Sequence, residues 1–392
     1  MPLFYGVLSS CYFRGDPLNV TCSLHVSSFD SVEAARMEYS VTLYLKMKWR
    51  DPRLYHNGSD TIIVRTPEFV NRIWRPDVYF ENGKSGNFHG VTSDNRAMSI
   101  LYTGEIQYNV RLSLTLSCHM QLSGFPMDQH TCPMILLSYA YDARDIVLHW
   151  RKKLPVQLFQ HNELSQFTLV DYRTFDEIMT KEDNVQWSVL EARFYLRRQM
   201  GYYVLTTYLP STLLVILSWI SFWLHLDSTA ARVALGITTI LTEATQISTA
   251  RQGLPEVSYA TAIDVWLATC MFFVFVAMLE FATVHYIHVN GKRIVVRKRH
   301  EQMESSTGTE NATKRQKAEF KLHVDFENPK NNDDTRDVKK TMFKIGSRIT
   351  AKKIDQISRV LFPILFTLFN IIYWSIYLER KPPAMLSPVT EY

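Results

Sequence analysis

The stretch that decides the fold reads GYYVLTTYLPSTLLVILSWISFWL over residues 201–224 and contains no Asp, Glu, Lys or Arg. About 20 predominantly apolar residues are enough for a helix to cross a bilayer, so this stretch predicts a membrane span. Three further candidate spans follow at residues 229–250, 263–287 and 360–378. The first two of these three are amphipathic, as expected for helices of a bundle. The sequence therefore predicts four membrane helices after a long polar and aromatic region.

The distribution of basic residues predicts the orientation in the membrane. The residues directly after the third span include Lys292, Arg293, Arg297, Lys298 and Arg299. Basic loops stay in the cytosol, so four crossings place both termini outside. We expect a multi-pass protein of the plasma membrane with an extracellular N-terminus. The expected parts are an extracellular domain (1–198), helices one to three (199–289), a cytosolic loop ending in a pre-helix (290–352), a fourth helix (353–380) and an extracellular tail (381–392).

An extracellular N-terminal region has two consequences for its sequence. Asn19 and Asn57 each begin an Asn-X-Ser/Thr triplet and are candidate glycosylation sites, whereas Asn311 begins a triplet that this topology places in the cytosol. Export also needs a leader, and Met1-Pro2-Leu3 runs into polar sequence without the apolar core of one. We expect a leader to precede this sequence in the natural reading frame.

The region before the first span has the alternation of β-strands. Residues 39–49 and 110–117 alternate apolar and polar side chains with period two. Turn-forming clusters at residues 81–84 and 92–95 separate such runs, as in an antiparallel sandwich. The predicted fold class is mixed: an extracellular antiparallel β-sandwich followed by a four-helix transmembrane bundle.

The cysteines fit an oxidising compartment. Cys11, Cys22, Cys118 and Cys132 lie in the outer region, and an even number there permits disulfides. Cys11 and Cys22 could pair or remain buried thiols, and both alternatives are open. Cys270, in the third span, is most simply a small packing residue.

Several motifs together resemble one family. They are Phe125-Pro126-Met127-Asp128 between Cys118 and Cys132, Trp74-Arg75-Pro76-Asp77, and Leu217-Ser218-Trp219-Ile220-Ser221-Phe222-Trp223. The chain resembles the Cys-loop receptors, which are pentameric ligand-gated ion channels, and within them the glycine, GABA and invertebrate glutamate or histamine chloride-channel branch. The resemblance implies a Cys118–Cys132 disulfide, four further subunits (a homopentamer by default), a small-molecule agonist, a permeant anion and a lipid surround.

The second span, extended to residues 229–251, has the pattern of a pore helix. Small or hydroxylated residues and one leucine recur at spacings of four and three, which places them on one helical face: Ala234, Thr238, Leu241, Thr245 and Ser248. Such a face suits a hydrated pore with one apolar constriction that closes by dewetting. We expect Leu241 to be the gate. The alternative is that Leu241 is an ordinary packing residue.

Ala231 and Arg232, at the expected cytosolic mouth, are the candidate selectivity residues. The resemblance implies that a cation channel would carry a glutamate just before Arg232, and none is present. Five copies of Arg232, with the positive ends of five helices, would favour anions. Arg232 could instead be an anchor at the lipid headgroups, and Ala230 replaces the proline usual in anion-conducting relatives. A cation-selective or proton-modulated channel and a non-conducting accessory subunit are the alternatives.

Glu243 is the one acidic residue of this predicted helix. Two positions past Leu241 is about 200° around the helix, so its side chain turns away from the lumen. A carboxylate there must be paired, hydrated or protonated. It either fixes the bundle by polar pairing or biases gating by its protonation.

The resemblance also implies an agonist site between adjacent outer domains. Its principal face would comprise Tyr79, Tyr139, Tyr141 and Trp187, and its complementary face Tyr44, Lys46, Asn109 and Arg111. Aromatic rings attract an ammonium group, and a basic side chain holds a carboxylate. Glycine receptors have an acidic residue where Leu137 stands, and amino-acid receptors an arginine in place of Lys46, so the agonist stays open.

Other classes of protein are excluded by what the sequence lacks. It has no nucleotide-binding glycine loop, no nucleophile motif and no metal-ligand spacing among its 12 histidines. We therefore expect no enzyme, no cofactor and no metal site. The net charge of +5 is modest and no basic, aromatic-interleaved stretch is present, so no nucleic-acid partner is expected.

Overall fold

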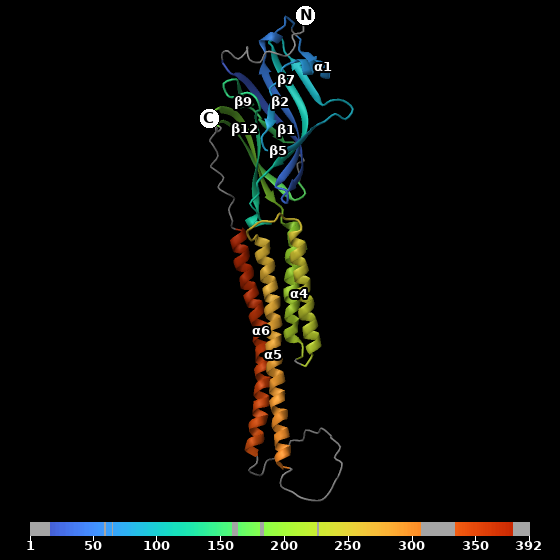
Figure 1. Cartoon of the computed structure of the whole chain (residues 1–392), viewed down its shortest axis with the longest axis vertical. Helices are drawn as coiled ribbons and strands as arrows, with labels where there is room; N and C mark the ends of the chain where they lie inside the picture. The colour runs from blue at the N-terminus through green and yellow to red at the C-terminus, as the bar shows by residue number, and fades with distance from the viewer. Residues whose placement is uncertain are drawn as a thin grey trace. The chain divides into compact units, whose positions relative to one another are not determined.

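A computed structural model of the chain describes residues 16–58, 60–64, 66–158, 164–180, 184–225, 227–306 and 334–378 (Figure 1). Within these ranges the side chains of residues 67, 291–306 and 334–351 are not described. The chain forms two compact units. The first contains Met1–Tyr202, Arg251–Ala262 and Lys381–Tyr392, and the second contains Tyr203–Ala250 and Ile263–Arg380. Cys11, Asn311 and the predicted tail lie outside the described residues.

The first unit is built from two β-sheets. The larger sheet has the order β10-β1-β2-β7-β6-β3, with β5 on β7 and β9 on β1. Its strands are β1 (Leu18–Glu33), β2 (Glu38–Arg50), β3 (Ile62–Val64), β5 (Gly83–Phe88), β6 (Arg96–Ile100), β7 (Glu105–Ser117), β9 (Ile146–Trp150) and β10 (Val156–Leu158). The smaller sheet has the order β11-β12-β8-β4. It consists of β4 (Val78–Phe80), β8 (Gln129–Ser138), β11 (Phe167–Thr180) and β12 (Gln186–Arg198). Short helices η1 (Pro52–Leu54), α1 (Pro67–Arg72) and η2 (Leu122–Gly124) join strands.

The alternation in the sequence explains which faces of the sheets are buried. In β2, Leu43, Leu45 and Met47 are buried while Tyr44 and Lys46 between them are not. β2 pairs in antiparallel register with β7, whose residues alternate in the same way. One face of the larger sheet therefore lies on the core and the other does not, as a period-two pattern predicts.

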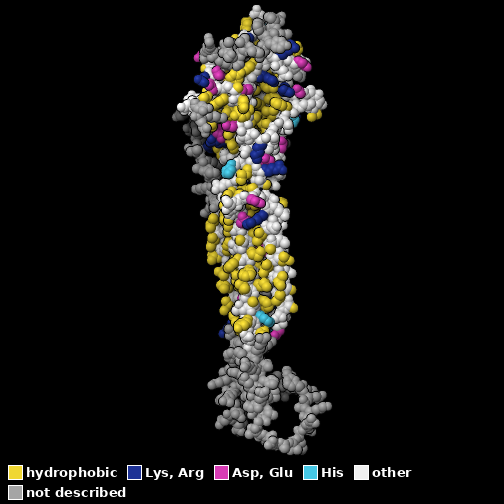
Figure 2. All heavy atoms as spheres, viewed as in Figure 1, with side chains coloured by type: hydrophobic (Ala, Val, Ile, Leu, Met, Phe, Trp, Pro, Cys, Tyr) yellow, Lys and Arg dark blue, Asp and Glu magenta, His cyan; other side chains and the backbone are white. Residues whose placement is uncertain are grey.

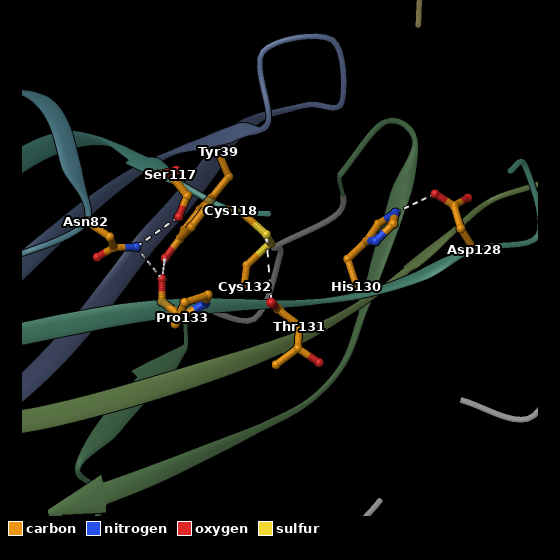
Figure 3. The surroundings of a disulfide bond; sticks show 9 residues. All are labelled: Tyr39, Asn82, Ser117, Cys118, Asp128, His130, Thr131, Cys132 and Pro133. Carbon is orange, nitrogen blue, oxygen red and sulfur yellow. Dashed lines mark hydrogen bonds and ion pairs between the residues drawn. A yellow bond between two sulfur atoms is a disulfide. The ribbon is translucent and has the colours of Figure 1, made fainter. Parts of the chain in front are cut away.

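A disulfide and a hydrogen bond join the two sheets near the end of β7. Cys118, just after β7, forms a disulfide with Cys132 of β8, which joins the larger sheet to the smaller one (Figure 3). The buried Tyr39 of β2 donates a hydrogen bond to the Pro133 carbonyl of β8 at 2.8 Å. The core between the sheets includes an edge-to-face contact of Phe29 with Phe194 at 5.3 Å. The disulfide that the family resemblance implied is thus present.

The second unit is helical. A nearly continuous first helix consists of α2 (Gly201–Tyr203), η3 (Val204–Tyr208), α3 (Leu209–Trp219) and η4 (Ile220–Trp223), and three long helices follow: α4 (Thr229–Arg251), α5 (Ala262–Ser306) and α6 (Asp334–Leu378). Inside the unit Trp266 of α5 donates to Ser211 of α3, and the hydroxyls of Tyr208 and Tyr373 are 2.8 Å apart. Figure 2 shows hydrophobic side chains over much of the visible helical surface. Such a surface suits a lipid solvent.

Three stretches of the described chain are long and apolar enough to cross a membrane: Gly201–Trp223, Ala262–Asn290 and Lys352–Leu378. They correspond to the first, third and fourth predicted spans. The second predicted span is also a helix, α4, but it does not reach the same hydropathy because it is rich in threonine and serine. The predicted fold class, a β-sandwich followed by a helical membrane region, is confirmed.

Candidate functional site

The four predicted residues of the principal face lie on or beside the smaller sheet. Tyr79 is in β4, Trp187 is in β12, and Tyr139 and Tyr141 follow β8. The rings of Tyr79 and Tyr139 meet edge to face at 5.6 Å, and Tyr139 is 76% exposed. This exposed ring, backed by a second ring, is available to a ligand or to a neighbouring subunit.

Asp77 fixes the loop that carries these tyrosines. Its carboxylate accepts hydrogen bonds from the Ser138 hydroxyl at 2.5 Å and from the Ala140 backbone N–H at 2.7 Å. The Ser138 oxygen in turn accepts from the N–H of Tyr141 at 3.1 Å. From the sequence, Asp77 was identified as part of a family motif but was assigned no role. The one sign of this role in the sequence was that Asp77 follows Pro76, because a short polar side chain beside a proline is typical of a residue that orders a turn.

The four predicted residues of the complementary face lie on the larger sheet. Tyr44 pairs across strands with Arg111, and Lys46 pairs with Asn109, so all four are on the face turned away from the core. The Arg111 guanidinium lies over the Tyr44 ring at 5.8 Å. Lys46 and Asn109 are exposed. This face presents two basic groups beside an aromatic ring.

His25 is part of the complementary face, and sequence reasoning missed it. It pairs in register with Tyr44, and the two rings meet edge to face at 5.9 Å. Its Nδ1 lies 3.1 Å from the Gln157 side-chain oxygen. The alternating pattern of β1 placed His25 on the same face as Ser23, but only strand pairing shows that it adjoins Tyr44.

The principal and complementary sets are not brought together within one chain. The first is on strands β4, β8 and β12 of the smaller sheet, and the second is on β2 and β7 of the larger sheet. This separation is what the resemblance implies for a ligand bound between subunits.

The Cys118–Cys132 loop contains a buried ion pair. The Arg198 guanidinium donates to the two carboxylate oxygens of Asp128 at 2.8 and 3.0 Å. His130 Nε2 contacts the same carboxylate, as Figure 3 shows. Burial raises the pKa of Asp128, but hydrogen bonds from His130 and Arg198 and the charge of Arg198 outweigh it and lower the pKa to about 2. The pair fixes the end of β12 to the loop.

The loop also contacts the connection after α4, which belongs to the first unit. The backbone N–H of Leu122 in η2 donates a hydrogen bond of 2.9 Å to the Tyr259 hydroxyl. A displacement of the loop would therefore act on the segment that directly follows α4 in the chain.

The low pKa of Asp128 predicts how acid destabilises the extracellular unit. A carboxyl whose pKa falls from 3.8 to about 2 on folding contributes about 2 kcal/mol above pH 4, and that contribution is lost as the pH falls through 2. We expect Asp128→Asn to unfold more easily than the unchanged chain at pH 7, with the difference shrinking below pH 4. Thermal unfolding of the detergent-solubilised protein across pH measures this. Asp94→Asn, at a surface pair with Arg96, is the control with little effect.

The predicted pore-lining residues form one exposed stripe of α4. Ala234, Thr238, Leu241, Thr245 and Ser248 are all exposed, as is Ala231, and Leu241 is 63% exposed. Thr239 and Glu243, on the opposite side of the helix, are buried. In a single subunit this stripe contacts nothing that would bury it, although it lies in a membrane helix.

Arg232 is placed differently from the expected free ring of charge. It is 2% exposed, and its guanidinium donates to both carboxylate oxygens of Asp355 in α6, at 2.9 and 3.3 Å, and to the Leu224 carbonyl at 2.5 Å. It also lies 5.8 Å from the Phe281 ring centre. Its charge is therefore compensated inside the subunit, because the helix turns it toward α6 and not toward the stripe.

Glu243 is completely buried, and neither carboxylate oxygen has a hydrogen-bond partner in the part of the chain described. The expectation that it turns away from the stripe agrees with this position. A carboxylate so placed is costly to ionise.

The remaining predictions concern the glycosylation sites, the outer cysteines and metal ligands. Asn19 and Asn57 are exposed, as an acceptor for a sugar must be. Cys22 is buried and forms no disulfide with any described cysteine, and burial and the nearby charge of Asp176 raise the pKa of its thiol to about 12. Across the described ranges no group of three or more His, Cys, Asp or Glu side chains could hold a metal ion.

Comparison with known families matches both units. Residues 8–200 match the neurotransmitter-gated ion-channel ligand binding domain, and residues 207–318 match the neurotransmitter-gated ion-channel transmembrane region. The two matches follow each other in the order of the β-sandwich and the helices. The sandwich with its disulfide-closed loop, the apolar helices and these matches agree: the chain belongs to the neurotransmitter-gated ion-channel family, the Cys-loop receptors, and is a ligand-gated ion channel subunit.

Proposed function

We propose that the chain is a pore-forming subunit of a pentameric, ligand-gated chloride channel of the plasma membrane. The observation that carries this proposal is the exposed stripe of α4. A row of small and hydroxylated side chains offers lipid little apolar surface, whereas several copies facing one axis would enclose it around water. Leu241 is then the one large apolar side chain among the five lining residues, and it forms the gate. Five copies follow the pentameric architecture of the family.

The charge of this stripe supports an anion. Glu243 is the one acidic residue of α4, and it is buried on the opposite side. The stripe therefore presents no carboxylate to an ion, and the positive end of the α4 dipole lies beside Ala231. Since Arg232 is compensated by Asp355, the proposed preference rests on the absent carboxylates and the helix ends more than on Arg232 itself.

The agonist is proposed to bind between subunits. The principal face of one subunit, with Tyr79, Tyr139, Tyr141 and Trp187, would meet the complementary face of the next, with Tyr44, Lys46, Asn109 and Arg111. One exposed and three half-buried rings on one side and two basic groups on the other suit a small molecule with an anionic or polar group. Its binding would favour the open arrangement of the pore by differential affinity for it.

The proposal predicts the ion that carries current. Chains expressed alone in oocytes are expected to conduct when Leu241 is made polar, and the reversal potential should follow external chloride. Replacing most external chloride by a large impermeant anion should shift the reversal potential by about 59 mV for each tenfold change in chloride concentration, the limit for one elementary charge. A reversal potential that follows sodium would contradict the anion assignment. A chain that reaches the surface but never conducts would indicate an accessory subunit.

A further inference from the structure

His130 lies against the buried Asp128–Arg198 ion pair of the first unit. The Asp128 Oδ2 atom accepts from Arg198 Nη2 at 3.0 Å and also contacts His130 Nε2. The side chains of Asp128, His130 and Arg198 are each 2% exposed. One carboxylate oxygen is thus shared by a permanent cation and an imidazole, and all three side chains are buried.

Among the described residues, charged or aromatic groups from three elements lie around His130. Its own turn contributes Asp128, β12 contributes Arg198, and β11 contributes the Phe167 ring at 6.2 Å, which has no titratable group. Arg197 pairs in register with Gln129 and is exposed, so it lies on the opposite face of β12. Phe167 and Phe125 pack on the Arg198 guanidinium at 4.3 and 4.7 Å. Aromatic rings therefore pack on the cluster, and Asp128 is the one carboxylate that pairs with His130 or Arg198 among the described residues.

Protonation of His130 would change the charge of this cluster. With a neutral imidazole, Asp128 and Arg198 cancel. With an imidazolium, two cations share one carboxylate and a net positive charge is buried, which is unfavourable for side chains with so little exposure to solvent. Imidazole is the side chain whose charge ordinarily changes between pH 5 and 8. The cost is relieved if the Asp128–Arg198 contact loosens or water enters.

Arg198 connects this cluster to the membrane helices, because it lies just before the first of them in the chain. Arg198 is the last residue of β12, and its backbone N–H also donates to the Asp128 carbonyl at 3.2 Å. The first membrane helix begins in the chain at Gly201. We propose that His130 is a proton-binding regulatory site of this channel, and that proton uptake loosens the contact between the Cys118–Cys132 loop and the end of β12 and so shifts the opening equilibrium. The inference rests on the proposed channel function.

The test uses full-length chains with Leu241→Ser, so that current needs no agonist. Surface-normalised current is measured from pH 8 to pH 5.5 in this parent, with His130→Gln and with His119→Gln. Glutamine keeps an N–H donor for Asp128 but cannot gain a proton. His119 is the matched control, because it lies on the same loop and is exposed. For each subunit, a tenfold difference in proton affinity between the two conformations changes the open-to-closed ratio by at most about tenfold.

The expected result is a pH-dependent step of several-fold in the parent and in His119→Gln that is lost in His130→Gln. Equal pH profiles in the parent and His130→Gln would overturn the inference and leave the channel function standing. A parent that carries no current at any pH would overturn the proposed function and the inference with it. If His130→Gln does not reach the surface, His130→Asn replaces it. If neither neutral variant reaches the surface, His130 has a structural role only, and the inference is overturned.

Discussion

Leu241→Ser is expected to give a current that needs no agonist. Replacing leucine by serine removes the apolar surface that excludes water from the proposed constriction. If each of five copies loses only about 1 kcal/mol of the closed state's stability, the sum of about 5 kcal/mol changes the open-to-closed ratio by roughly 10³- to 10⁴-fold. Whole-cell current in the absence of any added ligand, normalised to surface protein, measures the effect.

Ile247→Ser provides the matched control for Leu241→Ser. Ile247 lies on α4 about 240° further round an ideal helix and is half-buried, so it is not part of the stripe. It should give no ligand-independent current. Equal currents from both variants would show that any serine in α4 opens the channel, and Leu241 would lose its proposed place as the gate.

Arg232→Met is expected to prevent stable folding of the helical unit. Methionine keeps much of the volume but leaves Asp355 without its cation, and Asp355 is itself buried. Removing one partner of a buried ion pair costs about 3–5 kcal/mol, because the other charge stays unpaired. We expect little Arg232→Met protein at the cell surface, measured by surface biotinylation against total protein.

The double variant Arg232→Met/Asp355→Leu separates two interpretations of Arg232. Removing both charges of a buried pair is often neutral, so surface protein should recover. In the background that conducts without agonist, its chloride preference should also be retained, because the structure turns Arg232 away from the stripe. A recovered channel that loses its preference for chloride would instead support a ring of Arg232 charges at the pore mouth.

Sequence patterns predicted the local structure well where one physical rule acts over neighbouring residues. Period-two alternation identified β2 and β7 because adjacent side chains of a strand point to opposite faces. Spacings of three and four identified the α4 stripe for the same kind of reason, and its residues are exposed together. The absence of charge over residues 201–224 predicted the first span, which extends over Gly201–Trp223.

The sequence predicted less about contacts between distant residues. Arg232 and Asp355 are 123 positions apart, and nothing local to Arg232 shows that a carboxylate of α6 will meet it. His25 next to Tyr44, and Asp77 beneath Ser138, depend in the same way on which strands pair. Such pairs need the packed elements before they can be identified.

The sequence by itself determined that this chain is a β-sandwich followed by membrane helices, and which face of α4 carries the small and hydroxylated residues. Both follow from periodicity and hydropathy, which are properties of neighbouring residues. Only the tertiary structure decided that Arg232 is held inside the subunit by Asp355, and that His130 shares the Asp128 carboxylate with Arg198. The role of a charged side chain depends on its partner and on its access to water. Packing between elements far apart in the chain fixes both.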